Sequence, residues 1–154
     1  MAFRFVSGKG TVADPAAVMM YASGVVHPGG VVLFDAATSA VSPATATGAT
    51  TTNIFGVSLD YAQGASDTQV RVIPFAPGQL WEADCANAIS TANILLRHTL
   101  ATDTVLRNVV TLSETASTGI FLVYNVVGST SGSGKVVGTF LQRSATKSDH
   151  FALT

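Results

Sequence analysis

The chain has 154 residues, of which 47% are hydrophobic and only 11% are charged, and its formal net charge is −1. This length fits one domain with a core of its own, and the single cysteine excludes an intrachain disulfide. The basic residues are scattered, so the sequence does not predict the clustered phosphate contacts that nucleic-acid binding requires.

The small share of charged residues also affects how readily the chain would associate with other proteins. Ser, Thr, Gly and Ala must cover much of the surface, as in the stretch 42–52. Such a surface gives little electrostatic protection against association. We therefore interpret the chain as one that works inside an assembly, with an apolar monomer as the alternative.

The N-terminal segment begins with a short aromatic pattern, Phe3-Arg4-Phe5-Val6. Residues 1–9 lack the continuous apolar region of a signal peptide. A membrane-spanning helix needs about 18 apolar residues, and every apolar stretch of the sequence is much shorter. We therefore expect no membrane partner, and synthesis in a cytoplasm. We divide the chain into an N-terminal arm over 1–12 and a single β-rich domain over 13–154.

The next part of the chain combines short apolar runs with turn residues. Runs at 25–26 and 31–34 flank a turn cluster at 27–30. The stretch 35–53 is rich in Ala, Thr and Ser and has no period, which predicts a long loop.

The clearest strand signal lies at 55–62, where apolar residues alternate with small or polar ones. This period of two predicts one face in a core and the other toward solvent or a partner. A turn at 64–67 and a second alternating run at 68–73 complete a pair of strands. Pro74 has no N–H group to donate, so the second strand ends there or lies at an edge of a sheet.

The C-terminal half is again mostly of strand type. Apolar residues in 84–97 have helical spacing among mediocre helix formers, so we expect at most one short helix there. The run 104–112 is rich in β-branched residues and favours a strand. The runs 119–127 and 135–141 flank a Gly/Ser-rich tip and predict a hairpin. Together these elements predict an all-β domain with long loops.

The sequence contains no metal or nucleophile pattern. His27, His98 and His150 each lack a second His or Cys at ligand spacing. No Gly-x-Ser-x-Gly elbow is present. Because serines are abundant, a hydrolase with an assembled Ser, His and Asp site stays an alternative.

The sequence does not contain a complete phosphate-binding loop motif. A loop ending in Gly134 and Lys135 would need Gly at 129 and Ser or Thr at 136, where the chain has Ser129 and Val136. The segment also leads into a strand-type run, whereas phosphate would need a helix N-terminus.

Two acids stand close together in the sequence. Glu82 and Asp84 would share one face of a strand, as the carboxylates of glycosidases can. We interpret them as acids of a surface strand beside Trp81. The protein is therefore predicted not to be an enzyme, with no catalytic residues, no metal and no cofactor.

Residues 54–85 resemble the small decoration, or cement, proteins of tailed bacteriophage capsids. The resemblance is carried by Ile54-Phe55-Gly56-Val57-Ser58-Leu59-Asp60, by Val70-Arg71-Val72-Ile73-Pro74 and by Pro77-Gly78-Gln79-Leu80-Trp81-Glu82-Ala83-Asp84. The later segments 126–128 and 135–140 look like the closing hairpin of those proteins, so the resemblance covers roughly residues 54–142.

This resemblance implies a small β-barrel or β-tulip-like domain that forms a homotrimer on the exterior of a virion capsid. Its partner would be the major capsid protein, and its function would be mechanical: it would clamp neighbouring capsid subunits against internal DNA pressure. A tail, collar or fibre-tip protein whose loops at 35–53 and 128–134 contact a host receptor is the alternative.

The resemblance also implies a role for the N-terminal arm. Many proteins of this kind have an arm that adds to a capsid sheet, which makes Phe3, Arg4, Phe5 and Val6 candidate capsid contacts. An ordinary first strand of this domain is an equal alternative for the two phenylalanines.

Overall fold

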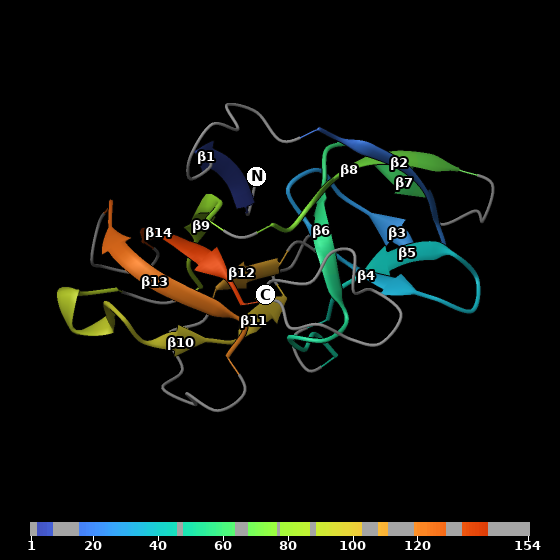
Figure 1. The fold of residues 1–154 in the computed structure, drawn as a ribbon. Helices are drawn as coiled ribbons and strands as arrows, with labels where there is room; N and C mark the ends of the chain where they lie inside the picture. The colour runs from blue at the N-terminus through green and yellow to red at the C-terminus, as the bar shows by residue number, and fades with distance from the viewer. Residues whose placement is uncertain are drawn as a thin grey trace.

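The structure is a computed structural model that describes residues 3–7, 16–45, 48–63, 68–76, 78–86, 89–102, 108–110, 119–128 and 134–141. Regular structure in these ranges is almost entirely β-strand, arranged as a closed barrel beside a five-stranded sheet (Figure 1). A 3-10 turn, η1 (Thr91–Asn93), is the one helical element of these ranges. The prediction of an all-β fold with a barrel and at most one short helix is confirmed.

Five strands close the barrel in the order β2-β5-β4-β6-β8. Their bounds are β2 (Val18–Ala22), β4 (Val31–Asp35), β5 (Ala40–Pro43), β6 (Ile54–Ser58) and β8 (Gln69–Pro74). Neighbouring strands are antiparallel except β2 and β5, which are parallel. The short strands β3 (Val25–Val26) and β7 (Ala62–Gln63) pair with each other.

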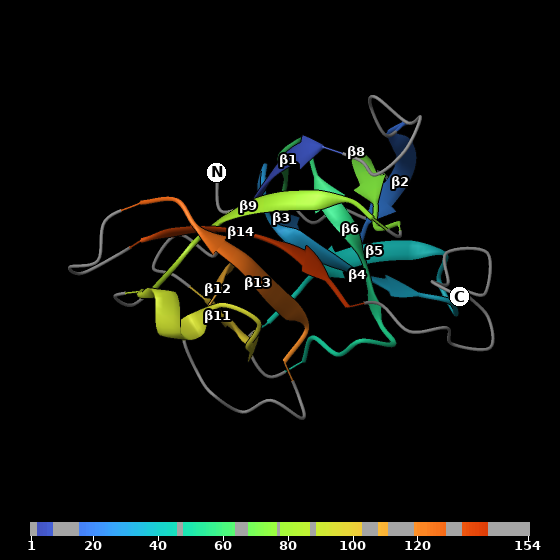
Figure 2. The same ribbon diagram turned by 60° about the vertical axis from the view of Figure 1, so that its left-hand side comes forward.

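The second unit is an antiparallel sheet with the order β1-β9-β14-β13-β10. Its strands are β1 (Phe3–Ser7), β9 (Leu80–Asp84), β10 (Arg97–His98), β13 (Phe121–Val126) and β14 (Lys135–Phe140). A further pair consists of β11 (Leu100–Thr102) and β12 (Asn108–Val110). Figures 1 and 2 both show the sheet and the barrel side by side, with β8 leading from the barrel toward β9.

Two apolar clusters hold these units together. One fills the barrel and includes Phe55, Val70 and Val72. The other extends from the barrel strands to the inner face of the sheet and includes Trp81 and Phe140. Because this second cluster contains residues from both units, the barrel and the sheet form a single packed body.

Strand β6 contributes to both clusters, and this corrects the predicted alternation. Phe55 packs in the barrel interior, whereas Ile54 and Val57 belong to the cluster shared with the sheet. All five residues of β6 are buried. The pairing with β4 shifts at Phe55, so Phe55 and Val57, expected on one core face, lie in different clusters. The face expected to meet solvent or a partner is buried as well, because Gly56 and Ser58 are both buried. A strand between two apolar layers has no wet face.

The predicted loop at 35–53 also needs correction, because it contains β5. A turn after Asp35 brings β5 back beside β4, and Ser39 in this turn has a positive φ of 54°. The Asp35 carboxylate accepts hydrogen bonds from the Ala37 N–H and the Thr38 hydroxyl. Alanine and serine are weak strand formers, but closure of the barrel gives β5 a hydrogen-bonding neighbour on each side.

The other predicted elements can be located directly. The hairpin of β13 and β14 is confirmed, as is the pairing of β6 with β8. Of the predicted strand 104–112, the structure describes β12, and the remainder lies outside the described residues. The hairpin tip at 129–133 and the boundary of the arm near residue 12 also lie outside them.

Candidate interaction surfaces

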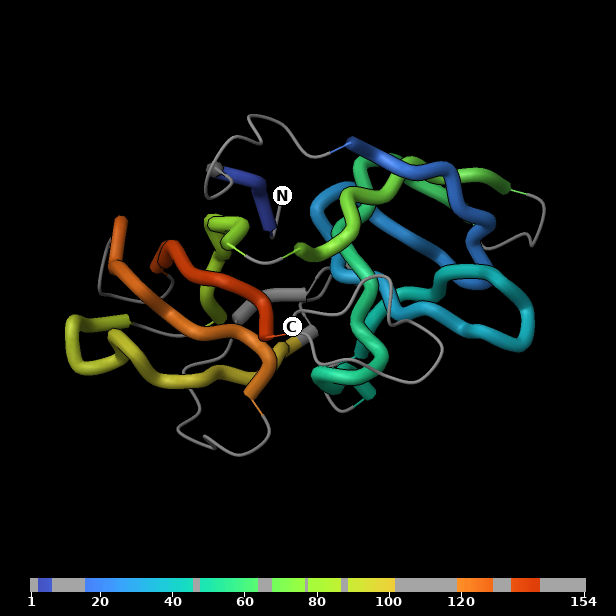
Figure 3. The backbone as a smooth tube through the Cα atoms, in the orientation of Figure 1, coloured from blue at the N-terminus to red at the C-terminus, as the bar shows by residue number. Residues whose placement is uncertain are grey.

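The N-terminal residues form an edge strand of the five-stranded sheet. Strand β1 pairs with β9 in the register Phe3 to Ala83 and Phe5 to Trp81. Phe3 is fully buried, and its ring packs against those of Phe121 and Phe140 at centroid distances of 6.0 and 5.0 Å. Figure 3 traces this first segment beside the rest of the sheet. The two phenylalanines thus belong to an ordinary first strand of this domain.

The alternate residues of β1 face outward. The Arg4 side chain donates a 2.9 Å hydrogen bond to Glu82 Oε2 on β9, and Val6 is exposed. Of the predicted capsid contacts, Arg4 and Val6 are therefore accessible to a partner, whereas Phe3 belongs to the core. Contact of this strand with a capsid stays a prediction.

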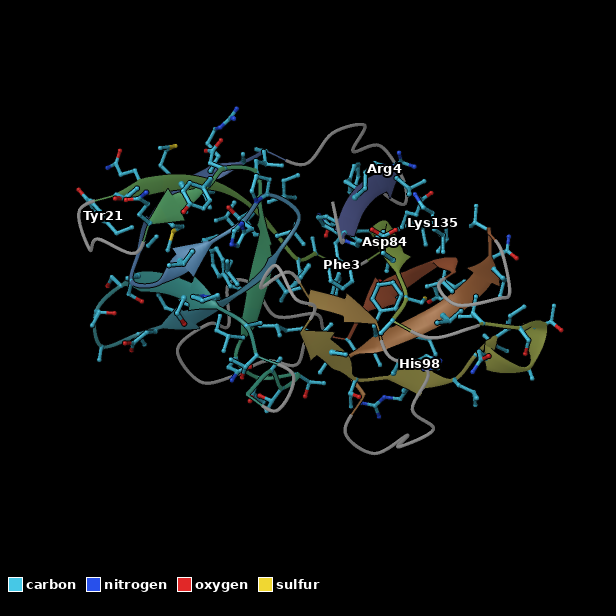
Figure 4. The ribbon with its side chains drawn as sticks, turned by 180° about the vertical axis from the view of Figure 1, so that it is seen from behind. Phe3, Arg4, Tyr21, Asp84, His98 and Lys135 are labelled. Atoms are coloured by element: carbon cyan, nitrogen blue, oxygen red, sulfur yellow. The ribbon has the colours of Figure 1, made fainter. Side chains whose placement is uncertain are left out.

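A row of charged residues crosses the outer face of the sheet. The Lys135 ammonium on β14 lies 3.6 Å from Glu82 and 3.7 Å from Asp84, and Arg4 lies on the other side of Glu82. Figure 4 shows Arg4, Lys135 and Asp84 close together on this part of the sheet. The two acids of the glycosidase alternative are thus strand residues beside Trp81, and each has a cation next to it.

An exposed leucine precedes β10, at the opposite edge of the same sheet. After η1, Leu95 adopts a positive φ of 65°, although its side chain is 67% exposed. The Leu95 N–H donates a 2.8 Å hydrogen bond to the Val123 carbonyl on β13. Left-handed backbone costs a residue with a Cβ about 1–2 kcal/mol, and glycine or asparagine usually occupies such positions.

The next residue on β13 is also exposed. Tyr124 is the extra residue of a β-bulge, since the pairing with β14 shifts between Val123 and Asn125. Its side chain is 44% exposed. Bulges redirect side chains and are common next to functional sites. Sequence reasoning placed no function here, because neither a bulge nor a positive φ at leucine has a local sequence signal.

The barrel carries a separate exposed surface. Met19, Tyr21 and Tyr61 are its exposed large apolar side chains among the described residues. Beside Tyr61, Asp60 binds the Arg71 guanidinium through two nitrogens, at 2.7 and 3.0 Å. These hydrogen bonds lower the pKa of the Asp60 carboxyl below its ordinary value. Tyr21 lies on the barrel, far from the labelled residues of the sheet (Figure 4).

The histidines and the cysteine occupy unrelated places. The imidazole of His98 is buried, with Nε2 3.5 Å from the Asn93 carbonyl and no partner for Nδ1 among the described residues. The His27 ring contacts that of Tyr61, and His150 lies outside the described residues. Burial, with the nearby Asp84 charge, raises the pKa of the Cys85 thiol to about 12.

The described residues form neither a metal-ligand cluster nor a membrane-spanning helix. No group of three or more His, Cys, Asp and Glu in these ranges is placed to hold a metal ion. No helix in this part of the chain has the length and apolar character needed to cross a membrane.

Comparison with known proteins shows a likeness in structure but none in sequence. No protein-family model matches the sequence, and no curated protein matches it significantly. The fold is similar to the crystal structure of the head fiber gp8.5 N base in bacteriophage phi29, with a TM-score of 0.48 and 16% sequence identity. The similarity covers 81% of this chain and 92% of that chain.

Proposed function

We propose that this protein is a structural virion protein of a tailed bacteriophage, which binds the capsid exterior and clamps neighbouring copies of the major capsid protein. The proposal is supported by where the residues of the sequence resemblance lie. They form β6 and β8 of the barrel and β9 and β14 of the sheet, all of which contribute to the core that the two units share. This framework carries exposed faces on both units.

The shared core suits a clamp, because a clamp must transmit force between its two contact sites. Phe75, just after the last barrel strand, stacks on Phe140 of the sheet with ring centroids 4.0 Å apart. Its ring also meets that of Trp81 edge-on. Close-packed interiors of this kind transmit strain instead of yielding to it. One capsid subunit held by the barrel and another held by the sheet would therefore be coupled.

We further propose that the protein acts as a homotrimer. A symmetric assembly presents several copies of each contact, so modest individual contacts add to a large avidity. The sparse charge of the surface lowers the cost of removing water from polar groups at such contacts.

The test is reconstitution on capsids. Purified protein is added to expanded capsids that lack it, and both its occupancy and the capsid disruption temperature are measured. We expect stoichiometric binding and a higher disruption temperature. A protein that neither binds nor raises this temperature has another function.

The alternative is a tail, collar or fibre-tip protein that contacts a host receptor. The observation in its favour is the pair of exposed tyrosines, Tyr21 and Tyr61, because tyrosine is enriched in recognition surfaces. Electron microscopy of particles carrying a label on this protein separates the two functions. Label over the capsid faces excludes the tail, and label confined to the tail excludes the capsid.

A further inference from the structure

The side chain of Arg97, on the edge strand β10, is held in place by the residue that leads into β13. Its Nε–H and an Nη2–H both donate to the Gly119 carbonyl oxygen, at 3.1 and 2.8 Å. Arg97 is half-buried and lies opposite Leu122 in the register of the two strands. Because the guanidinium is planar and rigid, two hydrogen bonds to one acceptor restrict it to a single orientation.

The other edge of this guanidinium is unused. No hydrogen bond from Nη1 occurs within the part of the chain that the structure describes. Nη1 is not buried either, because the buried side-chain atom that lacks a partner among these residues is Nδ1 of His98. The Nη1 protons and the second Nη2 proton are therefore open to a partner. This edge can donate to both oxygens of a carboxylate at once.

Arg97 also differs from the other described Arg and Lys residues in having no carboxylate within ion-pair distance among the described residues. Arg4 and Lys135 pair with acids of β9, and Arg71 pairs with Asp60. Strands β14 and β13 separate β10 from β9, which puts about 14 Å between them at about 4.8 Å for each step. The Debye length at physiological salt is about 8 Å, so the acids of β9 do not neutralise Arg97.

The position of Arg97 is costly for the free protein. A half-buried cation loses part of its hydration, and the Gly119 carbonyl replaces only part of it. A neutral side chain could donate to the same carbonyl without removing a charge from water. The positive charge therefore has no evident use within the described residues, although the backbone holds it in a defined orientation.

We propose that Arg97 binds an acidic side chain of the major capsid protein, an inference that rests on the proposed function. Charge complementarity identifies this occupant, since an oriented guanidinium with one open edge fits a carboxylate. Strand β10 forms an edge of the sheet, where a neighbouring protein can reach it (Figure 1). Arginine is also enriched among the few residues that dominate the free energy of protein binding.

Nucleic acid fits this position less well. A nucleic-acid strand needs several phosphate contacts on one face. The residues that follow Arg97 across the sheet are Leu122 on β13 and Thr139 on β14, and both are neutral. A single cation beside neutral neighbours matches one carboxylate, not a chain of phosphates.

A second copy of this chain is also a poorer occupant, because its described acids are already engaged. Asp60, Glu82 and Asp84 each have a cation beside them. Asp35 has none, but its two oxygens accept hydrogen bonds from the Ala37 N–H and the Thr38 hydroxyl in its own turn. The capsid protein can supply an acid without breaking any of these contacts.

The test uses two variants at the same position. Arg97→Gln removes the charge, and Arg97→Lys keeps it. Neither reproduces the two-nitrogen bond to Gly119, so any loss due to that bond appears in both variants, and their difference isolates the charge. The readouts are urea unfolding and sedimentation of the free protein, and its dissociation constant on expanded capsids that lack it, at about 50 and about 300 mM salt.

At low salt, Arg97→Gln should bind capsids at least about tenfold more weakly than the wild type, and Arg97→Lys should bind more tightly than Arg97→Gln. Raising the salt should narrow the gap between the wild type and Arg97→Gln by at least about threefold. It should leave the gap between the wild type and Arg97→Lys unchanged. In the free protein, the two variants should have the same urea midpoint and the same sedimentation coefficient.

Several outcomes overturn the inference. If the wild type binds capsids and the two variants bind equally well, the inference is wrong and the proposed function stands. If the wild type does not bind, the proposed function fails and the inference fails with it. Wild-type binding that does not change with salt overturns the inference without any variant.

The free protein gives two further outcomes that contradict the inference. A lower urea midpoint for Arg97→Gln than for Arg97→Lys assigns the charge to an acid of the same chain. A sedimentation coefficient that changes in Arg97→Gln but not in Arg97→Lys assigns it to a second copy.

Discussion

Arg4 and Glu82 form a 2.9 Å ion pair that joins the first strand to a strand 78 residues later in the chain. Only 14% of the Glu82 side chain is exposed, because Lys135 lies on its other side. The Arg4 side chain is 60% exposed, so the pair itself adds little to the free energy of unfolding. It marks the register of β1, in which Arg4 faces outward while Phe3 packs in the core.

The burial of Phe3 predicts that the N-terminal strand is required for stability before any capsid is present. Phe3→Ala removes a fully buried ring and should lower the free energy of unfolding by about 3–5 kcal/mol. The control Val6→Thr changes an exposed β-branched residue of the same strand and should alter it by no more than about 0.5 kcal/mol. Urea unfolding of the free protein measures both. Unchanged stability of Phe3→Ala would mean that the strand is not packed as described.

The close approach of β13 to Gly138 predicts that this glycine tolerates no side chain. A Cβ at this position would lie 2.1 Å from the Leu122 carbonyl oxygen and 2.6 Å from the Phe121 ring. Gly138→Ala must therefore separate the hairpin strands, at a cost of about 1–3 kcal/mol or more.

Gly128 provides the matched control for this substitution. A Cβ there has its nearest neighbour at 3.5 Å, so Gly128→Ala should leave stability within about 0.5 kcal/mol of the wild type. Thermal unfolding compares the two variants. Equal melting temperatures would contradict the close packing at Gly138.

The ion pair of Asp60 with Arg71 predicts an acid-sensitive contribution to stability. The pKa of Asp60 is lowered in the folded state, so the contribution is fully present above the unfolded value of about 3.9. It is lost as pH falls through the lower, folded value. Asp60→Asn abolishes this titration.

The measurement is urea unfolding of the wild type and Asp60→Asn between about pH 2 and pH 6. The difference in unfolding free energy should be constant above about pH 4 and should shrink below it. Arg71→Gln should show the same acid behaviour as Asp60→Asn. A difference that grows toward low pH has the wrong sign and would refute the lowered pKa.

The environment of Cys85 predicts an unreactive thiol. A thiol with a pKa of about 12 is almost entirely protonated at pH 8, and the thiolate is the reactive form. Iodoacetamide should therefore leave the native protein unlabelled in mass spectra while labelling it fully in urea. Rapid labelling of the native protein would show that Cys85 is accessible and ionised.

The local sequence pattern predicted those strands that pair with another strand nearby in the chain. The alternating runs that became β6 and β8 pair across a short connection, and so do β13 and β14. In these two pairs, the residues whose alternation predicts the strands are also the residues that pair with the neighbouring strand. The unexpected feature was the second buried face of β6, because burial by a distant layer does not change the local period.

The elements missed were those fixed by distant partners. Only Val41 of the four residues of β5, Ala40-Val41-Ser42-Pro43, favours a strand, and the parallel pairing of β5 with β2 arises from closure of the barrel. The packing of Phe3 depends on β9 and β14 far along the chain. The exposed Leu95 was missed because its positive φ follows from the turn and from its bond to Val123.

The position of β6 in both apolar clusters has a consequence for how the protein unfolds. Because it is a wall of the barrel and also part of the layer against the sheet, its loss removes support from both at once. Neither unit can melt while the other stays intact, so heating should give one calorimetric transition whose enthalpy equals the van't Hoff value. The same reasoning implies that the chain cannot be divided into a barrel and a sheet that are each expressed as a stable fragment.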